Sequence, residues 1–184
     1  MSTQAIEEIR KKLLELGAVK TAVLPISEIP FEPEFRTFCE SNACGKYKTS
    51  WSCPPHAGEV EDLIAHANSF SAVLVYQTIG EIEDSYDIEG MLEAGKVHEV
   101  LTRKIKNHCK DFGLQRYECL GSGSCDFCAE CTAPNGEPCR FPEELIVSID
   151  AYTVYVAELA KRCDMKYTNG ENTVTYFGMV LMSE

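Results

Sequence analysis

The chain has 184 residues, of which 45% are hydrophobic and 25% charged, and this balance is typical of one folded domain rather than a disordered chain. Its formal net charge of −12 disfavours binding to nucleic-acid phosphates and to anionic lipids. The first twenty residues are rich in charged side chains, and the longest apolar run, Ala72–Tyr76, is far shorter than the ~20 residues of a membrane helix. We therefore expect a cytoplasmic protein with a single domain over residues 1–184.

The predicted elements alternate between helix and strand. Apolar side chains at helical spacing predict a first helix that ends near Gly17, and a strand follows over 18–26. Further helices are expected at 34–41, 59–67, 89–111 and 149–163, and further strands at 71–79, 114–120 and 173–182. The run Ser71–Ile79 is apolar throughout, which indicates a strand buried on both faces. This alternation favours an α/β fold with about four strands in one layered, mixed sheet and with cysteine-rich metal-binding loops.

The chain contains ten cysteines, and most of them are clustered. In a reducing cytoplasm, clustered cysteines indicate metal or redox chemistry rather than disulfides. The densest cluster, called here the C-terminal cysteine group, is Cys125-x2-Cys128-x2-Cys131-x7-Cys139. Its two-residue gaps resemble the ferredoxin run, but that run ends in a three-residue gap, so spacing does not assign Cys139 to the same cluster. Asn135 and Gly136 predict a turn that could bring Cys139 back.

A second cluster, the N-terminal cysteine group, lies in a proline-rich segment and consists of Cys39, Cys44 and Cys53. Trp51 is the only tryptophan, and it could shield a metal site from water or simply pack in the core. Gly121 and Gly123 precede the C-terminal group, where they could free backbone N–H groups to bond cluster sulfides or form an ordinary turn.

The other candidate ligands carry weaker signals. Cys109, Cys119 and Cys163 stand alone and are expected to be packing residues, with Cys119 as the best spare ligand because it lies closest in sequence to the C-terminal group. The four histidines show no metal-ligand spacing, and we expect them to be exposed to solvent. The basic run 103–106 lies on a predicted helix and is expected to form a solvated face.

Together these motifs resemble a family of predicted metal-binding proteins of unknown function, found largely in anaerobic microbes. The residues that carry the resemblance are Cys39, Cys44, Trp51–Pro55, Gly121–Cys131, Cys139–Pro142 and Ser148–Tyr152. The resemblance covers most of the chain. It implies metal binding and, by composition, iron–sulfur chemistry, but it implies no known reaction.

The expected cofactor is therefore one or two 4Fe–4S clusters, with zinc as the alternative metal. Three functions follow from these alternatives. A cluster-bearing protein would exchange electrons with a redox partner protein. An enzyme would use a cluster with an open iron to bind a small-molecule substrate, and a zinc-stabilised interaction protein would have no redox role.

The number of clusters depends on how the N-terminal group is used. Its three thiolates predict a second cluster with one iron that no local cysteine binds. Two other interpretations stay open at this point. Cys119 is the fourth ligand in one, and in the other all seven clustered cysteines serve a single C-terminal cluster and a few packing positions.

Overall fold

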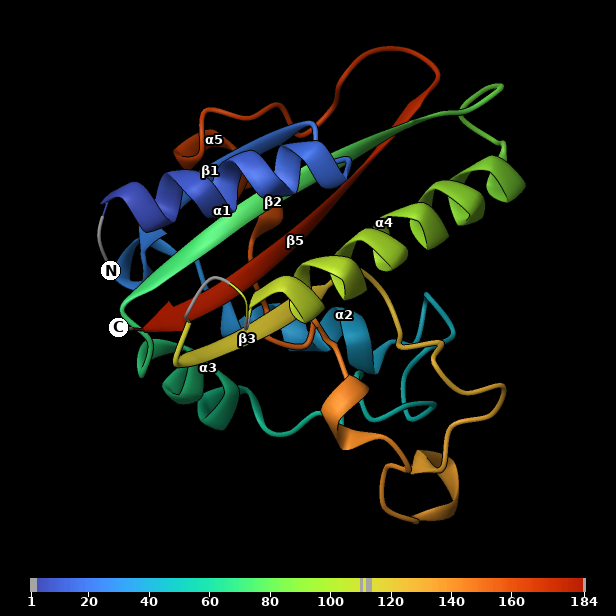
Figure 1. Ribbon diagram of the computed structural model, residues 1–184. Helices are drawn as coiled ribbons and strands as arrows, with labels where there is room; N and C mark the ends of the chain where they lie inside the picture. The colour runs from blue at the N-terminus through green and yellow to red at the C-terminus, as the bar shows by residue number, and fades with distance from the viewer. Residues whose placement is uncertain (1–2, 110, 112–113, 184) are drawn as a thin grey trace.

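The computed structural model describes residues 3–109, 111 and 114–183 (Figure 1). Within these residues, five strands form one sheet in the order β1-β2-β5-β3-β4. The strands are β1 (Lys20–Pro25), β2 (Ala72–Glu81), β3 (Arg116–Gly121), β4 (Val147–Ser148) and β5 (Thr173–Ser183). Neighbouring strands are antiparallel except for the parallel pair β3 and β4. The expected α/β class and mixed sheet are confirmed, with one strand more than the sequence predicted.

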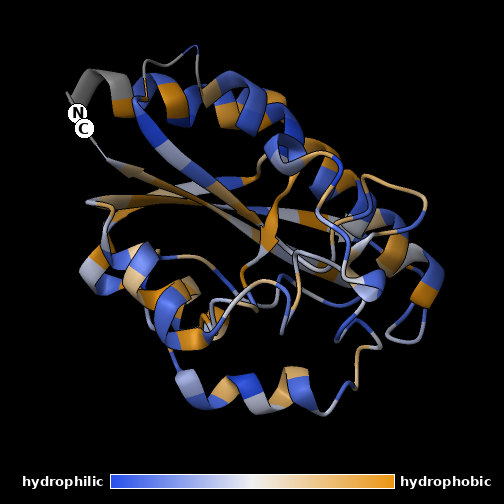
Figure 2. Ribbon diagram, turned by 90° about the horizontal axis from the view of Figure 1, so that it is seen from below, coloured by the Kyte–Doolittle hydropathy of each residue, from blue (hydrophilic) through white to orange (hydrophobic). Residues whose placement is uncertain are grey.

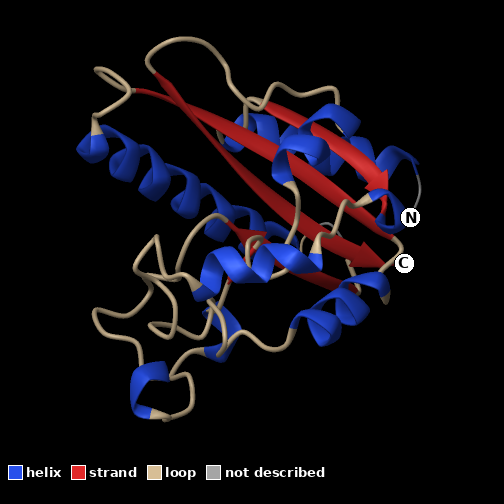
Figure 3. Cartoon of the chain, turned by 180° about the vertical axis from the view of Figure 1, so that it is seen from behind, coloured by secondary structure: helices blue, strands red, loops and turns tan. Residues whose placement is uncertain are grey.

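Helices cover both faces of this sheet (Figure 2). One face packs against α1 (Thr3–Leu16) and α4 (Ile88–Cys109), and the other packs against α3 (Val60–Asn68) and α5 (Val156–Arg162). The short helix α2 (Arg36–Glu40) lies among the loops that carry the cysteines (Figures 1 and 3). In the part of the chain that is described, no helix combines the length and apolar character needed to cross a membrane.

The strand β2 separates two hydrophobic cores. Leu74 and Tyr76 point into the core under α1 and α4, whereas Val73 and Val75 point into the core under α3 and α5. All four side chains are fully buried, because β1 and β5 flank β2 and helices cover both of its faces. The prediction of a strand buried on both faces is confirmed.

The expected helix over 149–163 is wrong in its first half. Helix α5 begins only at Val156, and the preceding residues form a buried turn. Thr153 has a φ of +54°, which no helix contains, and Val154 forms an isolated β-bridge with Phe31. The apolar pattern there reflects burial of Tyr152 in the core rather than helical periodicity.

Two long connections gather at one end of the sheet. The segment from α2 to α3 (cyan to teal) and the segment between β3 and β4 (gold to orange) lie side by side in Figures 1 and 3. The two-residue strand β4 contacts both. Ser148 N–H donates to Ser52 O in the first segment (3.1 Å), and Ile149 N–H donates to Gly121 O, where the second segment begins (2.9 Å). All seven clustered cysteines belong to these two segments.

Candidate metal centre

The N-terminal cysteine group lines one pocket of about 120 Å³. Cys53 is buried, Cys39 on α2 is half-buried, and Cys44 is exposed. The remaining wall includes Gly123 and Ser124 from the segment between β3 and β4, Ser148 on β4, and Asp150 just after it. The three cysteines therefore border a common space that the C-terminal segment helps to close.

Acidic groups gather in this pocket. Burial raises the pKa of the Cys39 thiol, and the charge of Asp150 raises it further, whereas the Arg36 guanidinium lowers it. Asp150 is exposed to solvent as a residue, yet neighbouring protein desolvates its carboxylate enough to raise its pKa. Thiolates and a carboxylate held this close repel one another when ionised, so a cation is their natural counter-charge.

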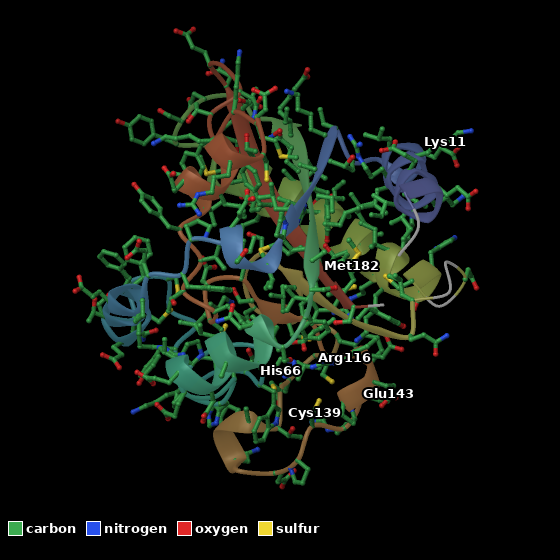
Figure 4. All side chains as sticks on the ribbon, turned by 90° about the vertical axis from the view of Figure 1, so that its left-hand side faces the viewer. Lys11, His66, Arg116, Cys139, Glu143 and Met182 are labelled. Atoms are coloured by element: carbon green, nitrogen blue, oxygen red, sulfur yellow. The ribbon has the colours of Figure 1, made fainter. Side chains whose placement is uncertain are left out.

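In the C-terminal group, the backbone brings Cys131 and Cys139 opposite each other. Thr132 Oγ1 donates to the carbonyl of the residue before Cys139 (3.0 Å), and Arg140 Nη2 donates to the carbonyl of the residue before Cys131 (3.1 Å). The expected turn is confirmed: Gly136 has a φ of +71°, which glycine adopts readily. Figure 4 shows Cys139 in the loop region beyond the sheet. The seven-residue gap therefore returns this cysteine to the group.

Cys125 is held from two sides. Its N–H donates to Ser52 Oγ (2.7 Å), and Arg103 Nη2 lies 3.7 Å from its sulfur. The guanidinium of Arg103 is fixed by Glu99 (2.6 Å) and stacks on the Phe127 ring at 4.9 Å from its centroid. The structure describes no comparable side-chain contact for Cys128.

The expectation of a solvated basic face over residues 103–106 is wrong at two positions. The Arg103 side chain is only 19% exposed, and Lys106 Nζ donates to Leu145 O (2.9 Å). Both side chains hold the C-terminal segment against α4, whereas Lys104 between them is exposed. The sequence does not contain this information, because the contact depends on how a distant loop packs on the helix.

Glu99 adds a titratable group beside the C-terminal site. Burial and a hydrogen bond with Asp126 raise the pKa of Glu99 to about 7, although Arg103 acts in the opposite direction. Glu99 therefore changes its protonation state near neutral pH.

Buried serines connect the two cysteine groups. Ser52 Oγ, which accepts the Cys125 N–H, also lies 3.8 Å from Cys53 Sγ and 2.8 Å from Ser50 Oγ. Ser124 Oγ donates to Ser50 Oγ (3.2 Å). Sequence reasoning missed these serines, since small polar residues in a loop carry no metal signal of their own.

Trp51 forms a clamp between the two segments. Its Nε1–H lies 3.2 Å from both Thr132 Oγ1 and Glu137 O, and its ring lies 5.4 Å from that of His56. The side chain is half-buried. Its role as a shield for a metal site stays a prediction.

The two glycines before Cys125 serve different local needs. Gly123 has a φ of +80° and lines the N-terminal pocket. Gly121 packs so tightly that an added Cβ would lie 3.0 Å from Ile146 Cγ2. Backbone conformation favours glycine at position 123 and lack of space favours it at position 121, and the contact of either residue with a cofactor stays a prediction.

The isolated cysteines are packing residues, as expected. Cys163 belongs to the core under α3 and α5, and Cys109 and Cys119 lie in the other core with their sulfurs 3.9 Å apart. The hydrogen bond with Cys109, together with burial, raises the pKa of the Cys119 thiol well above its usual value. Cys119 thus lies in the core under α1 and α4 and does not line the pocket of the N-terminal cysteine group, so its position does not support the alternative of a spare ligand.

Solvent exposure is wrong for one of the four histidines. His98 is 1% exposed and lies between the rings of Tyr76 and Tyr176, at 5.5 Å and 5.7 Å. Burial lowers the pKa of His98 to about 4. It is therefore a neutral core residue at physiological pH.

Nowhere in the described ranges do three histidine, cysteine, aspartate or glutamate side chains converge closely enough to hold a single metal ion. A structural zinc requires four ligands around one ion. The thiolates of an iron–sulfur cluster each bind a different iron, so they stand apart from one another. Free thiols are donors to zinc and to iron–sulfur clusters alike, so this donor set fits a metal centre of either kind.

These features define an α/β protein whose two cysteine groups meet in adjoining loops at one end of a mixed sheet. The chain matches a family model described as predicted metal-binding protein (DUF2284) over residues 22–182, and it belongs to this family. The matched range contains both cysteine groups, Trp51 and the paired glycines. No curated protein and no solved structure matches the chain.

Proposed function

We propose that the two cysteine groups each hold a 4Fe–4S cluster and that the protein exchanges electrons with a redox partner protein. One observation carries this proposal: Ser52 bonds the backbone of Cys125 and contacts the sulfur of Cys53, so the two groups adjoin each other. Electrons pass efficiently only between centres that lie close together. When bound, such clusters supply one-electron redox chemistry.

The protein's own groups suit this role. The guanidinium of Arg103 lies against the Cys125 sulfur, where a positive charge and an N–H donor favour extra negative charge. The Trp51 clamp and the bonds that flank Cys131 and Cys139 hold the C-terminal segment in one conformation. A fixed ligand frame reduces the rearrangement that accompanies electron transfer.

We also propose a cytoplasmic location, because ten free thiols persist best in a reducing compartment. A role as a zinc-stabilised interaction protein is the main competing function, and metal analysis separates the two.

The test is anaerobic purification of the full chain from an iron-replete culture, followed by iron, zinc and acid-labile sulfide analysis and electron paramagnetic resonance. We expect brown protein with iron and sulfide in amounts that two clusters require. Stoichiometric zinc without sulfide would contradict the proposal.

A further inference from the structure

We propose that Asp150 is the fourth ligand of the N-terminal site and completes it as a centre with three thiolates and one carboxylate. This inference rests on the proposed function and adds a residue that the cysteine pattern does not contain.

The position of Asp150 is the first argument. Asp150 lines the pocket of about 120 Å³ together with Cys39, Cys44 and Cys53. It also lines a neighbouring hollow of about 350 Å³ that contains Cys39 and Cys44 again. Asp150 therefore borders both spaces together with Cys39 and Cys44.

The second argument is that the carboxylate is already oriented. Ser148 Oγ donates to Asp150 Oδ2 (3.0 Å), and Asp150 N–H donates to Ser148 Oγ (3.2 Å). Ser148 is itself 2% exposed and fixed by its strand pairing. Among the described residues, no hydrogen-bond donor contacts Oδ1. Metal-ligating carboxylates are commonly held in this way, with one oxygen bonded by the protein and the other free for the metal.

Elimination is the third argument. Cys119, the spare cysteine, is buried in the other core beside Cys109. The other polar groups on the pocket wall are an amine, a phenol and hydroxyls, from Lys46, Tyr47, Ser124 and Ser148. Among the non-cysteine side chains that line the pocket, Asp150 alone offers a carboxylate, which is the commonest oxygen ligand of metals in proteins.

This ligand set has a chemical consequence. Iron in a cluster prefers soft thiolate, so the iron bound to a carboxylate oxygen is the most weakly held of the four. That iron is the one expected to leave on oxidation, or to exchange its ligand for a small molecule. The N-terminal site thus differs from the all-cysteine C-terminal site.

The experiment compares the anaerobic full-length protein with Asp150→Cys and Asp150→Ala. Ferricyanide removes one electron from a cluster, and a weakly held iron then leaves as Fe²⁺, which gives a three-iron cluster with its own paramagnetic signal. We expect this conversion in the wild type, at least ~tenfold slower conversion in Asp150→Cys, and faster conversion in Asp150→Ala.

The matched control is Asp62→Asn, which removes an exposed carboxylate of α3 that lines neither of these two spaces. It should leave the rate of iron release unchanged. Wild-type protein without iron and sulfide would overturn the proposed function itself. Wild-type protein with both clusters, but with equal conversion rates in Asp150→Cys and wild type, would overturn only the ligand assignment.

Discussion

Ser52 shows what a single small side chain contributes at the residue scale. Its Oγ accepts the Cys125 N–H and contacts Cys53 Sγ, and its carbonyl accepts the Ser148 N–H. The residue is fully buried. A buried hydroxyl is costly unless it is bonded, so these contacts also fix the relative position of the two cysteine groups.

Arg103 leads to a prediction about redox potential. Arg103→Gln removes the positive charge and the donor 3.7 Å from Cys125 Sγ. The reduced, more negative cluster loses stabilisation, so we expect the midpoint potential of the C-terminal cluster to fall by roughly 50 mV, about 1 kcal/mol for one electron. Paramagnetic redox titration measures this. Lys104→Gln, the same charge change at an exposed position of the same helix, should leave the potential unchanged.

His98 leads to a prediction about pH. Its pKa is about 4 in the folded protein, because burial disfavours the charged ring, and the ordinary value is 6.5. The unfolded chain therefore takes up a proton first as the pH falls, and the stability present above pH 6.5 is lost towards pH 4. Between pH 7.5 and pH 5 we expect this residue to cost about 2 kcal/mol of unfolding free energy.

The variant His98→Gln tests this, since glutamine does not titrate and can still bond Thr78 Oγ1 (2.9 Å in the native protein). Urea unfolding of both proteins at the two pH values gives the difference. If the variant loses as much stability as the wild type on acidification, His98 is not responsible.

At the scale of elements, the two cysteine-bearing segments are bound to each other as well as to the sheet. Trp51 joins one segment to Thr132 and Glu137 of the other, and β4 joins both to the end of β3. Helix α4 adds two hydrogen bonds to the C-terminal segment, because Arg103 donates to Glu144 O and Lys106 donates to Leu145 O. The loops thus form a common unit at the end of the sheet.

The clamp is testable by substitution. Trp51→Phe keeps a ring beside His56 but removes the N–H donor. We expect a loss of about 1 kcal/mol of unfolding free energy and faster release of metal from the C-terminal group. Thr132→Val removes one of the two acceptors, so the two changes together should cost less than their sum. Tyr86→Phe, at a side chain that is 86% exposed, serves as the neutral control.

At the scale of the whole molecule, stability comes from two sources. The sheet and its helices bury two apolar cores that contain none of the C-terminal cysteine group. The C-terminal segment is mostly exposed or half-buried, and its contacts are largely polar. Its order should therefore depend on bound metal more than the order of the sheet does.

Removal of metal tests this division. After treatment with a chelator, chymotrypsin should cut after Phe127, which is 43% exposed, at least about tenfold faster than in the loaded protein. Cleavage at Tyr86, in a loop remote from the cysteines, should not change and provides the internal control. If the far-ultraviolet circular dichroism signal is lost when the metal is removed, the sheet and its helices also depend on metal, and the division between them and the C-terminal segment is wrong.

The sequence by itself determined the elements and the chemistry of the donors. Hydrophobic pattern predicted the central strand β2 and helix α4. A continuous apolar run indicates a strand buried on both faces, and apolar residues at helical spacing indicate a helix with one buried face. Cysteine spacing identified both groups, and the turn at Gly136 followed from local backbone preference. The family match over residues 22–182 agrees with the motifs that the sequence presented.

Only the tertiary structure decided which residues meet. It placed Cys119 in the opposite core, buried His98, turned Arg103 towards Cys125 and brought Asp150 beside the N-terminal thiols. It also replaced the start of an expected helix with a buried turn before Val156. These contacts join residues far apart in the chain, so they depend on packing between elements, which neither local propensity nor motif spacing encodes.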